Sequence, residues 1–493
     1  MTPRLDLAAL DQLPRELTPR VDPRALALGI VHLGIGAFHR AHQASYTEQA
    51  IAAEGGDWGI CGVTQRSSAV VDQLAPQDGL YTLSQRDGAG ERLRVIGAVR
   101  ETLWVQANPN AVMERMAAPT TRVVSLTVTE KGYHHDPATN RLDLASPDVA
   151  ADLNDGGART VVAQLARGLA RRRAHDGGPV TVLCCDNLPD NGRVLRGLVA
   201  DFVHRLPEDD GLGDWIAANV TFPSSMVDRI TPATTAEDLD RIAAALGARD
   251  EGAVVTEPFT QWVIEDDFAA GRPAWERAGA IMTDDVRPYE QIKLRLLNGS
   301  HSTLAYLGRL ADCEFMADTV RPEAPFAAVV RRLMTIDLAP TLTVPDGFDL
   351  TAYEDQLFAR FANPELRHRT SQVAMDGSQK LPARLLAPIL ERRRAGDEPV
   401  AATLGVAAWM RFVSARRSDS GRALTVDDPL ADEIAERLRG REDAEAVVDT
   451  LLGFEQIFDA ELAGDAPWRA LLIDNLTALI RDGAERTARR VAG

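Results

Sequence analysis

Three side chains near residue 295 have the types and spacing to oxidise an alcohol. Lys293, Asn298 and His301 lie in RPYEQIKLRLLNGSHSTLAYLG, and Glu290 precedes the lysine by about one helical turn. On a helix that advances about 100° per residue, these four side chains share one arc with leucines of the same segment. An unpaired lysine on an apolar arc is costly or loses its proton, so its position needs a functional reason.

These residue types suit hydride transfer from a carbinol carbon. A desolvated lysine acts as a general base, an amide donates to a developing oxyanion, and a histidine orients a hydroxyl. The base takes the hydroxyl proton while the carbon gives its hydride to a nicotinamide, and no metal ion is needed. The structural alternative is that Lys293 snorkels to solvent while Asn298 and His301 cap a buried loop. Gly299, inside the helix, indicates close approach of a ligand or of backbone.

A glycine-containing turn follows the first apolar run. GIVHLGIGAFHRAHQ places Gly34 and Gly36 between a strand pattern and a helical pattern, where a dinucleotide fold has its phosphate turn. The first glycine allows the tight turn, and the second lets the backbone approach a pyrophosphate near the helix N-terminus. His39 stands where a third glycine would be expected, so a purely structural turn is the alternative. The predicted cofactor contacts are Gly34, Gly36, Ala37, Phe38, His39 and Arg40.

The segment after the second predicted strand bears on the choice of cofactor. An acidic residue there usually accepts hydrogen bonds from the ribose of NAD. This sequence has GVTQRSSAVVD, which offers no carboxylate before Asp72. Arg66 and the neighbouring hydroxyls could instead hold a 2′-phosphate, although Arg66 could also be a solvated residue at a strand end. NAD is the expected cofactor, with NADP left open.

The pattern of the chain predicts which elements position these residues. From residue 25 to about 285, short β-branched runs alternate with helical stretches such as 145–153 and 158–173, which predicts βαβ units and a mostly parallel sheet. We therefore expect an α/β fold, with a Rossmann-like doubly wound domain over 1–285 and a mostly α-helical domain over 286–493. The strand candidates are GIVHLG (29–34), WGICGV (58–63), RVVSLTVT (122–129), PVTVLCC (179–185) and VTFPSSMV (220–227).

Composition excludes several classes of protein. The chain has 493 residues, 45% hydrophobic and 26% charged, which is typical of a folded globular protein. Its 54 Lys and Arg against 72 Asp and Glu give a net charge of −18, which disfavours nucleic acid and anionic membranes as partners. The N-terminal segment resembles no secretory signal and no apolar run is long enough to span a membrane, so we expect a soluble cytoplasmic protein.

No metal site is predicted. The four cysteines, Cys61, Cys184, Cys185 and Cys313, lie in apolar runs without zinc-ligand spacing, so we interpret them as buried reduced thiols. The run HHD at 134–136 also lacks ligand spacing.

Five motifs together resemble the mannitol dehydrogenase family, the polyol-specific long-chain dehydrogenases. They are GIVHLGIGAFHRAHQ, TVTEKGY, CDNLPDNG, MVDRITP and KLRLLNGSHSTLAYLG, in this order, and the similarity extends from about residue 25 to 480. The resemblance implies NAD(P)-dependent, zinc-independent interconversion of a polyol or aldonate with its ketose or keto-uronate. It also favours a monomer. Many NAD-specific members carry an acidic residue shortly after the second strand, whereas this sequence has QRSS at 65–68.

The resemblance also implies roles for single residues. Lys293 matches the general base, Asn298 an oxyanion donor and His301 a substrate-orienting histidine, while Glu290 matches a carboxylate that relays the proton to solvent. Two further matches concern substrate contacts. Asp228 matches a residue that touches substrate hydroxyls, and Lys380 resembles a cation near the far end of the substrate. In CDNLPDNG, Asn187 resembles a second oxyanion asparagine, with Asn191 as a competing candidate.

Several functions fit these residues. The leading hypothesis is interconversion of D-mannitol and D-fructose or of a close stereoisomer, and the runner-up is D-mannonate oxidoreductase, which reduces fructuronate. A carboxylate substrate demands a cation, and Arg367, Arg369, Lys380 and Arg384 are the candidates. More distant alternatives are a 3-hydroxyacid or 6-phosphogluconate type of dehydrogenase, and a dinucleotide-binding regulator without turnover.

Overall fold

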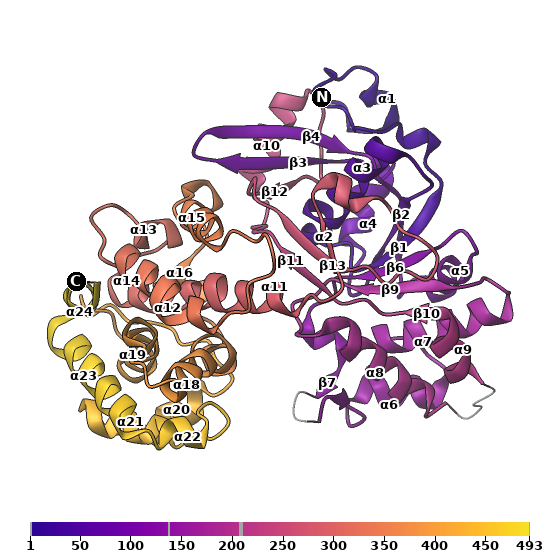
Figure 1. The fold of residues 1–493 in the computed structure, drawn as a ribbon. Coiled ribbons are helices and arrows are strands. Elements are labelled where there is room, and N and C mark those ends of the chain that lie inside the picture. The colour runs from indigo at the N-terminus through magenta and orange to yellow at the C-terminus, as the bar shows by residue number, and fades with distance from the viewer. Residues whose placement is uncertain (1, 137–138, 207–210, 493) are drawn as a thin grey trace. The chain divides into compact units, whose positions relative to one another are not determined.

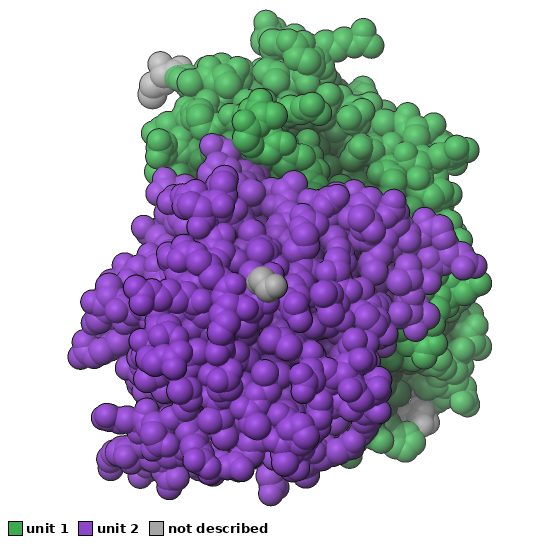
Figure 2. Space-filling model, turned by 60° about the vertical axis from the view of Figure 1, so that its left-hand side comes forward, with its two compact units in different colours: residues 1–287 green, residues 288–493 purple. Residues whose placement is uncertain are grey.

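The chain divides into two compact units, residues 1–287 and 288–493 (Figure 2). The computed structural model describes residues 2–136, 139–206 and 211–492. The boundary between the units falls two residues after the predicted one at 285. In the described ranges, no helix is long and apolar enough to cross a membrane.

Unit 1 is built on a six-stranded parallel sheet with the order β10-β9-β6-β1-β2-β5 (Figure 1). Chain order runs outward from β1 through β2 and β5, and then from β6 through β9 and β10 on the other side. The switch point between β1 and β6 is where doubly wound folds bind their ligands. The strands are β1 (Leu28–Leu33), β2 (Gly59–Thr64), β5 (Val99–Trp104), β6 (Val123–Leu126), β9 (Val180–Cys184) and β10 (Val220–Thr221).

Helices cover both faces of this sheet, and alternate residues of β1 point into two different cores. Val31 and Leu33 pack with α5, α7 and α8, whereas Ile30 packs with α3 and with Trp262 and Trp275. The helices of unit 1 are α1 (Leu7–Leu10), α2 (Ala37–Ala41), α3 (Gln43–Glu54), α4 (Ala69–Leu74), α5 (Pro109–Ala117), α6 (Pro147–Asp155), α7 (Val161–Ala174), α8 (Asn191–Val203), α9 (Leu212–Asn219) and α10 (Ala236–Leu246). The predicted doubly wound α/β domain is therefore confirmed.

Two smaller three-stranded sheets and a two-stranded ribbon complete unit 1. Their strand orders are β11-β13-β14, β12-β3-β4 and β7-β8. Their strands are β3 (Tyr81–Asp87), β4 (Gly90–Ile96), β7 (His135–Asp136), β8 (Arg141–Leu142), β11 (Ser225–Asp228), β12 (Val254–Thr256), β13 (Gln261–Glu265) and β14 (Ile281–Thr283).

One predicted strand is wrong in part, and several strands were not predicted, among them β5 of the main sheet. The run VTFPSSMV is not one strand: β10 ends at Thr221 and β11 begins at Ser225 in a different sheet. Pro223 lies between them and has no N–H for a ladder, which accounts for the break. β5 was missed because VRETLW carries charged residues, which an edge strand of the sheet tolerates.

Unit 2 is helical, as predicted. Its long helices α12 and α19 pack closely at Gly405, where an added Cβ would lie 2.6 Å from the Thr303 hydroxyl oxygen. Its helices are α11 (Arg287–Ile292, which begins at the unit boundary), α12 (Ser300–Leu310), α13 (Met316–Thr319), α14 (Phe326–Arg332), α15 (Leu350–Phe361), α16 (Thr370–Val373), α17 (Gly377–Leu381), α18 (Ala387–Arg394), α19 (Val400–Ala415), α20 (Ala431–Arg437), α21 (Ala444–Leu452), α22 (Ala460–Ala463), α23 (Ala466–Asp482) and α24 (Ala484–Ala492).

Candidate active site

The turn after β1 has the geometry expected of a phosphate turn. Gly34 and Ile35 donate their backbone N–H groups to the Val63 carbonyl of β2, at 2.8 and 3.1 Å. Gly34 has φ = +107°, and a Cβ there would lie 2.0 Å from the Thr127 carbonyl oxygen, so only glycine fits. At Gly36 an added Cβ would meet only the Gly34 oxygen, 3.9 Å away. The first glycine therefore shapes the turn, and the second leaves its outer side open.

The first residues of α2 divide into two groups. Ala37 and Phe38 are half-buried beside the open glycine. His39 is buried and stacks on His32 of β1, with ring centroids 3.4 Å apart. The imidazole ring of His39, stacked on β1, thus occupies the position of the third glycine in a GxGxxG turn.

Arg40 differs from its predicted role as a cofactor contact. Its side chain is buried, its Nε donates to the Gly36 carbonyl at 3.3 Å, and its Nη1 donates to the Gly252 carbonyl. The guanidinium lies 5.7 Å from the ring centroid of Tyr81, and burial lowers its pKa. These contacts favour a role in holding the turn in place over direct contact with a phosphate.

A cavity of about 780 Å³ opens at the carboxyl ends of β2, β5 and β6. Gln65 and Arg66, which follow β2, form part of its wall, and Arg66 is exposed. Lys131 contributes a second cation from the segment after β6. The cavity is therefore on the edge of the sheet where a doubly wound fold binds a nucleotide.

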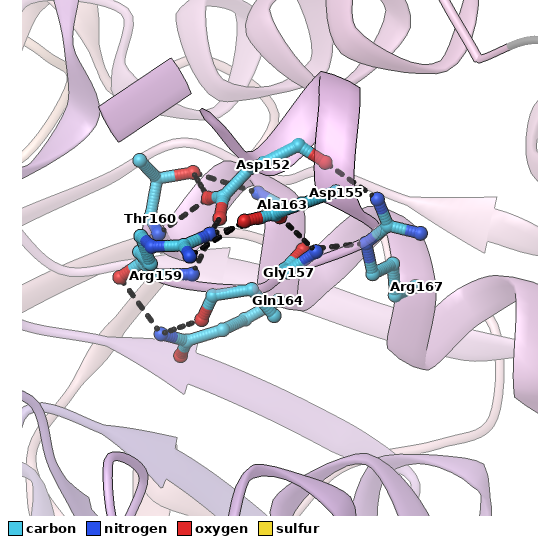
Figure 3. Close-up of polar contacts among 9 residues, drawn as sticks. Asp152, Asp155, Gly157, Arg159, Thr160, Ala163, Gln164 and Arg167 are labelled. Carbon is cyan, nitrogen blue, oxygen red and sulfur yellow. Dashed lines mark hydrogen bonds and ion pairs between the residues drawn. The ribbon is translucent and has the colours of Figure 1, made fainter. Parts of the chain in front are cut away.

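The connection between α6 and α7 forms another wall of this cavity, and polar contacts hold it (Figure 3). Asp152 is fully buried and accepts hydrogen bonds from the backbone N–H groups of Arg159 and Thr160, at 2.9 and 2.8 Å. The guanidinium of Arg159 donates to both oxygens of Asp155, at 2.9 and 2.6 Å. Arg167 donates to the Gly157 and Asp152 carbonyls, at 2.6 and 2.7 Å. These hydrogen bonds fix the backbone of the α6–α7 connection, so this wall of the cavity keeps its shape without a ligand.

The segment that carries Lys293 and Asn298 is a π-helix. Between α11 and α12 the chain forms η5 (Lys293–Gly299), in which hydrogen bonds connect residues five apart instead of four. The angular positions that the sequence predicted for these side chains on a regular α-helix are therefore wrong in detail, because a π turn holds more residues than an α turn. Single π turns occur often at functional sites, where they re-aim side chains.

A second π-helix, η9 (Pro382–Leu386), packs against η5. A Cβ on Gly299 would lie 3.0 Å from the Arg384 carbonyl oxygen, so the close approach expected at this glycine is to backbone. Arg295 also anchors η5, through an ion pair with Glu391 of α18 at 2.6 Å. The segment that carries the predicted base is thus held by at least two contacts within unit 2.

His301 is buried at the start of α12 among aromatic and cationic side chains. Its ring centroid lies 4.8 Å from that of Phe361 and 5.5 Å from that of His368. Burial lowers the pKa of His301 well below its usual value, and the charges of His368, Arg360 and Arg384 lower it further. The imidazole is therefore neutral near pH 7 and can both donate and accept one hydrogen bond.

The four candidate cations have different surroundings. Arg384 Nη1 donates to the Ser302 hydroxyl at 3.1 Å and lies 3.5 Å from the Asn298 carbonyl oxygen. Arg369 is paired with Glu314, and the guanidinium groups of Arg367 and Arg369 lie over the ring of Phe315. Lys380 Nζ donates to the Met375 carbonyl at 2.7 Å. Of the four, Arg384 is the one whose charge acts on His301.

The two asparagines of CDNLPDNG also differ. Asn191 donates both hydrogens of its amide, to the Asp186 and Ser225 carbonyls at 2.9 and 2.7 Å, and its oxygen accepts from Ser225 N–H. It has no amide hydrogen left for a substrate, so Asn187 is the better oxyanion candidate. Asn187 and Asp228 belong to unit 1, and Glu290 lies on α11 of unit 2.

Sequence reasoning missed residues that remote elements bring to these sites. Arg360 and His368 reach His301 from α15 and from the segment before α16, and nothing in their local sequence indicates this contact. Lys131, which lines the cavity of unit 1, and Gln164, which donates to Gln65 at 2.9 Å, are brought there by folding in the same way. Among the described residues, no group of three or more His, Cys, Asp or Glu could hold a metal ion. The four cysteines are free thiols, and all but Cys313 are fully buried.

A doubly wound domain with a glycine turn, joined to a helical domain that carries a lysine, an asparagine and a histidine on the adjoining segments η5 and α12, is the arrangement of a two-domain dehydrogenase. Comparison with known proteins gives the particular family. The Mannitol dehydrogenase Rossmann domain matches residues 28–277, and the Mannitol dehydrogenase C-terminal domain matches residues 285–479. The chain is an oxidoreductase of the mannitol dehydrogenase family.

Relatives cover nearly the whole chain. An uncharacterized oxidoreductase of Escherichia coli (strain K12), YeiQ, is 46% identical over 90% of both chains. The D-mannonate oxidoreductase of the same organism is 42% identical over 96% of both chains. The Pseudomonas fluorescens mannitol 2-dehydrogenase, solved as a ternary complex with NAD and D-mannitol, is 37% identical over 99% of both chains, with a TM-score of 0.86.

Proposed function

We propose that this protein is a nicotinamide-dinucleotide-dependent oxidoreductase that interconverts a hexonate and its keto-hexuronate, of the D-mannonate and D-fructuronate type. The observation that supports this proposal is the position of Arg384, whose Nη1 donates to the Ser302 hydroxyl at 3.1 Å and lies 3.5 Å from the Asn298 carbonyl oxygen. A relative named D-mannonate oxidoreductase, 42% identical over 96% of the chain, agrees with it.

The electrostatics around His301 favour an anionic substrate. A hexonate carries a carboxylate at one end of the molecule, and a carboxylate in a partly dry site needs a cation and hydrogen-bond donors. Arginine binds carboxylates with two parallel hydrogen bonds, which fixes orientation as well as affinity. Arg384 supplies such a guanidinium in unit 2, held by contacts with the Asn298 carbonyl and the Ser302 hydroxyl.

The turn of unit 1 fits a dinucleotide. Gly36 is exposed, and its missing side chain leaves room for a phosphate next to the backbone. We assign dinucleotide binding to Gly34, Gly36, Ala37 and Phe38, with NAD as the cofactor because the mannitol 2-dehydrogenase of the ternary complex is bound to it. When bound, the nicotinamide supplies the hydride acceptor.

The proton chemistry is assigned to unit 2. Lys293 Nζ takes the proton of the carbinol hydroxyl as the C–H bond gives up its hydride, so alcohol and oxidised dinucleotide become ketone, reduced dinucleotide and a proton. The Asn298 amide donates to the carbinol oxygen, and neutral His301 orients a neighbouring hydroxyl. Glu290, one turn before the lysine, passes the proton to solvent. Asn187 and Asp228 stay predictions from the family resemblance.

A polyol and its ketose are the second candidate pair, and they were the leading hypothesis from the sequence. The likeness to the mannitol 2-dehydrogenase bound to D-mannitol favours them. A polyol is neutral, so it would leave the charge of Arg384 without a role in substrate binding.

Initial rates of oxidation of NADH and of NADPH, followed at 340 nm, separate the two candidates. D-fructuronate and D-tagaturonate are compared with D-fructose and D-xylulose as substrates. We expect a keto-uronate to have the highest kcat/KM. A higher kcat/KM for D-fructose or D-xylulose would contradict the hexonate proposal, and binding of the dinucleotide without turnover of any ketone would favour a regulator.

A further inference from the structure

We propose that Arg295 and Glu391 are positioning residues for the reacting groups of unit 2, because their ion pair holds η5 in its π-helical form. The inference rests on the roles that the proposed function gives to Lys293 and Asn298. Both of these residues belong to η5, which continues from α11 into α12 as one long helix (Figure 1).

The π turn changes which side chains share a side of this helix. On a regular α-helix, Asn298 would lie about 140° around the axis from Lys293, because each residue advances about 100°. In a π-helix the hydrogen bond connects residues five apart, so residue i+5 takes the place above residue i that residue i+4 has in an α-helix. Lys293 and Asn298 are five apart and both lie in η5. The π turn therefore brings the proposed general base and the oxyanion donor to one side.

The same turn aligns His301 with Lys293. A π turn accommodates about one more residue than an α turn, so the eight steps from Lys293 to His301 cover roughly the rotation of seven on an α-helix, which ends about 20° from the start. A regular α-helix would leave about 80° between them. Exposure agrees with this arrangement, since Lys293 and Asn298 are half-buried, whereas residues 295–297 are buried. The three groups thus lie along one side of the helix.

Tertiary contacts must support the π turn. π-Helices are rare and occur mostly as single turns within α-helices, so the surroundings have to favour one over the regular helix. Two other π-helices approach η5 at Gly299. A Cβ there would lie 3.0 Å from the Arg384 carbonyl oxygen of η9 and 3.5 Å from Leu338 Cδ1 of η6 (Leu333–Leu338). This end of η5 therefore has little room to rearrange.

Arg295 holds the middle of η5 with its guanidinium group. Its Nη1 and Nη2 donate to the two oxygens of Glu391, at 2.7 and 2.6 Å, and Nη1 also donates to the Thr341 carbonyl at 2.7 Å. Two parallel hydrogen bonds to a carboxylate fix orientation as well as distance. The side chain of Arg295 is 10% exposed, so solvent screens this pair less than it screens a pair at the surface.

One continuous helical segment supplies both contacts. Glu391 lies on α18, which follows η9 directly, and η9 carries Arg384. The segment therefore meets η5 at Arg295 and again at Gly299. Converting η5 to an α-helix would rotate Arg295 relative to Gly299, because the number of residues per turn would change. Both contacts could not then be kept, so the ion pair favours the π-helical form.

Steady-state kinetics of Arg295→Met test the proposal, with the ketone that the parent reduces fastest. We expect kcat to fall by about ten- to a hundredfold, because misplacing a reacting group by about 1 Å can cost about a hundredfold. The KM of the ketone should change by less than about threefold, since Lys293 and Asn298 act mainly in the transition state. The Kd of NADH, measured by nicotinamide fluorescence, should stay within about twofold because dinucleotide binding is assigned to unit 1.

Glu391→Gln breaks the same ion pair from its more exposed side. It should lower kcat by about five- to fiftyfold. Added to Arg295→Met, it should lower kcat by less than about twofold further, because both substitutions remove one interaction.

Arg393→Met is the matched control. Arg393 also lies on α18, and it donates to both oxygens of Asp465, at 2.8 and 3.2 Å, and to the Asp397 carbonyl at 2.9 Å. The variant removes an ion pair of the same kind that does not include η5. Urea unfolding should show similar losses of stability in Arg393→Met and Arg295→Met, whereas kcat should fall only in Arg295→Met.

A parent-like kcat in Arg295→Met or in Glu391→Gln would overturn the positioning role, as would an equal loss of kcat in Arg393→Met. If Arg295→Met does not fold, Glu391→Gln and the control decide. A parent-like kcat in Lys293→Ala would instead contradict the proposed function. Failure of the hexonate proposal would leave this test intact, because the ketone is chosen by its rate.

Discussion

At the scale of single residues, Lys293 carries the acid–base chemistry of the proposed reaction. We predict that Lys293→Ala lowers kcat by about a hundredfold or more, because a positioned general base contributes at least that factor. The measurement is a steady-state rate with the best ketone or its alcohol. Dinucleotide affinity should stay within about twofold, since binding is assigned to unit 1.

Gln291→Ala, an exposed neighbour on α11, is the control and should keep the parent kcat. In the parent, alcohol oxidation should rise with pH because the base must lose its proton, and ketone reduction should favour lower pH. His301 should add no inflection near its usual pKa, because burial and then the nearby His368, Arg360 and Arg384 hold its pKa well below that value. A parent-like kcat for Lys293→Ala would remove the lysine as the base.

Residue types and spacing alone selected part of the candidate site. Lys293, Asn298 and His301 could be chosen because polar side chains on an apolar helix face need a reason. The sequence offered Arg384 only as one of four cations, since the contact with Ser302 depends on how two distant helices pack. It also gave no means to choose between Asn187 and Asn191, whose hydrogen bonds depend on β11.

At the scale of elements, the two glycines after β1 should have separable effects. A Cβ at Gly34 would collide with the Thr127 carbonyl at φ = +107°, whereas a Cβ at Gly36 meets open space at a negative φ. We predict that Gly34→Ala lowers the free energy of unfolding by about 2 kcal/mol or more. Gly36→Ala should keep that free energy within about 0.5 kcal/mol and weaken dinucleotide binding by at least about tenfold.

Urea unfolding and fluorescence titration with NADH, applied to both variants, measure these effects. Parent-like affinity in a folded Gly36→Ala variant would show that the dinucleotide does not approach this turn.

Element boundaries explain where sequence patterns failed. A 100° periodicity describes α-helices, so it could not reveal the π-helical turn at Lys293–Gly299. Apolar runs predicted β1, β2, β6 and β9 well because both faces of these strands are covered. β5, at the edge of the sheet, lacks that apolar pattern.

At the scale of the whole molecule, buried histidines should make the fold sensitive to acid. Burial lowers the pKa of His32 to about 3, and burial also lowers the pKa values of His39 and His368. Below pH 6.5 the unfolded chain then binds more protons than the folded one, so stability falls as pH falls. For His32 alone the loss at pH 5 is about 2 kcal/mol.

Among the described residues, six carboxyl groups act in the opposite direction, because burial raises their pKa values: Glu48, Asp186, Asp250, Asp337, Glu354 and Asp419. Burial raises the pKa of Glu48 to about 7 and that of Asp337 to about 6, so these groups add stability on acidification. Because the two sets of groups oppose each other, the prediction concerns His32 alone. Between pH 7 and pH 5 the free energy of unfolding of His32→Asn should fall by about 2 kcal/mol less than that of the parent, because the variant lacks the buried imidazole. His204→Asn, at an exposed position, should match the parent. An unchanged slope in His32→Asn would contradict the assignment.

If Arg384 selects a substrate with a carboxylate, its removal should change the preference between an acidic and a neutral ketose. The measurement is kcat/KM for D-fructuronate divided by kcat/KM for D-fructose, in the parent and in Arg384→Leu. Loss of a charge-assisted hydrogen bond should lower the ratio by about ten- to a hundredfold, with D-fructose turnover retained. Arg369→Leu, which removes a cation paired with Glu314, should leave the ratio unchanged. Equal losses on both substrates in Arg384→Leu, or an unchanged ratio, would contradict the account.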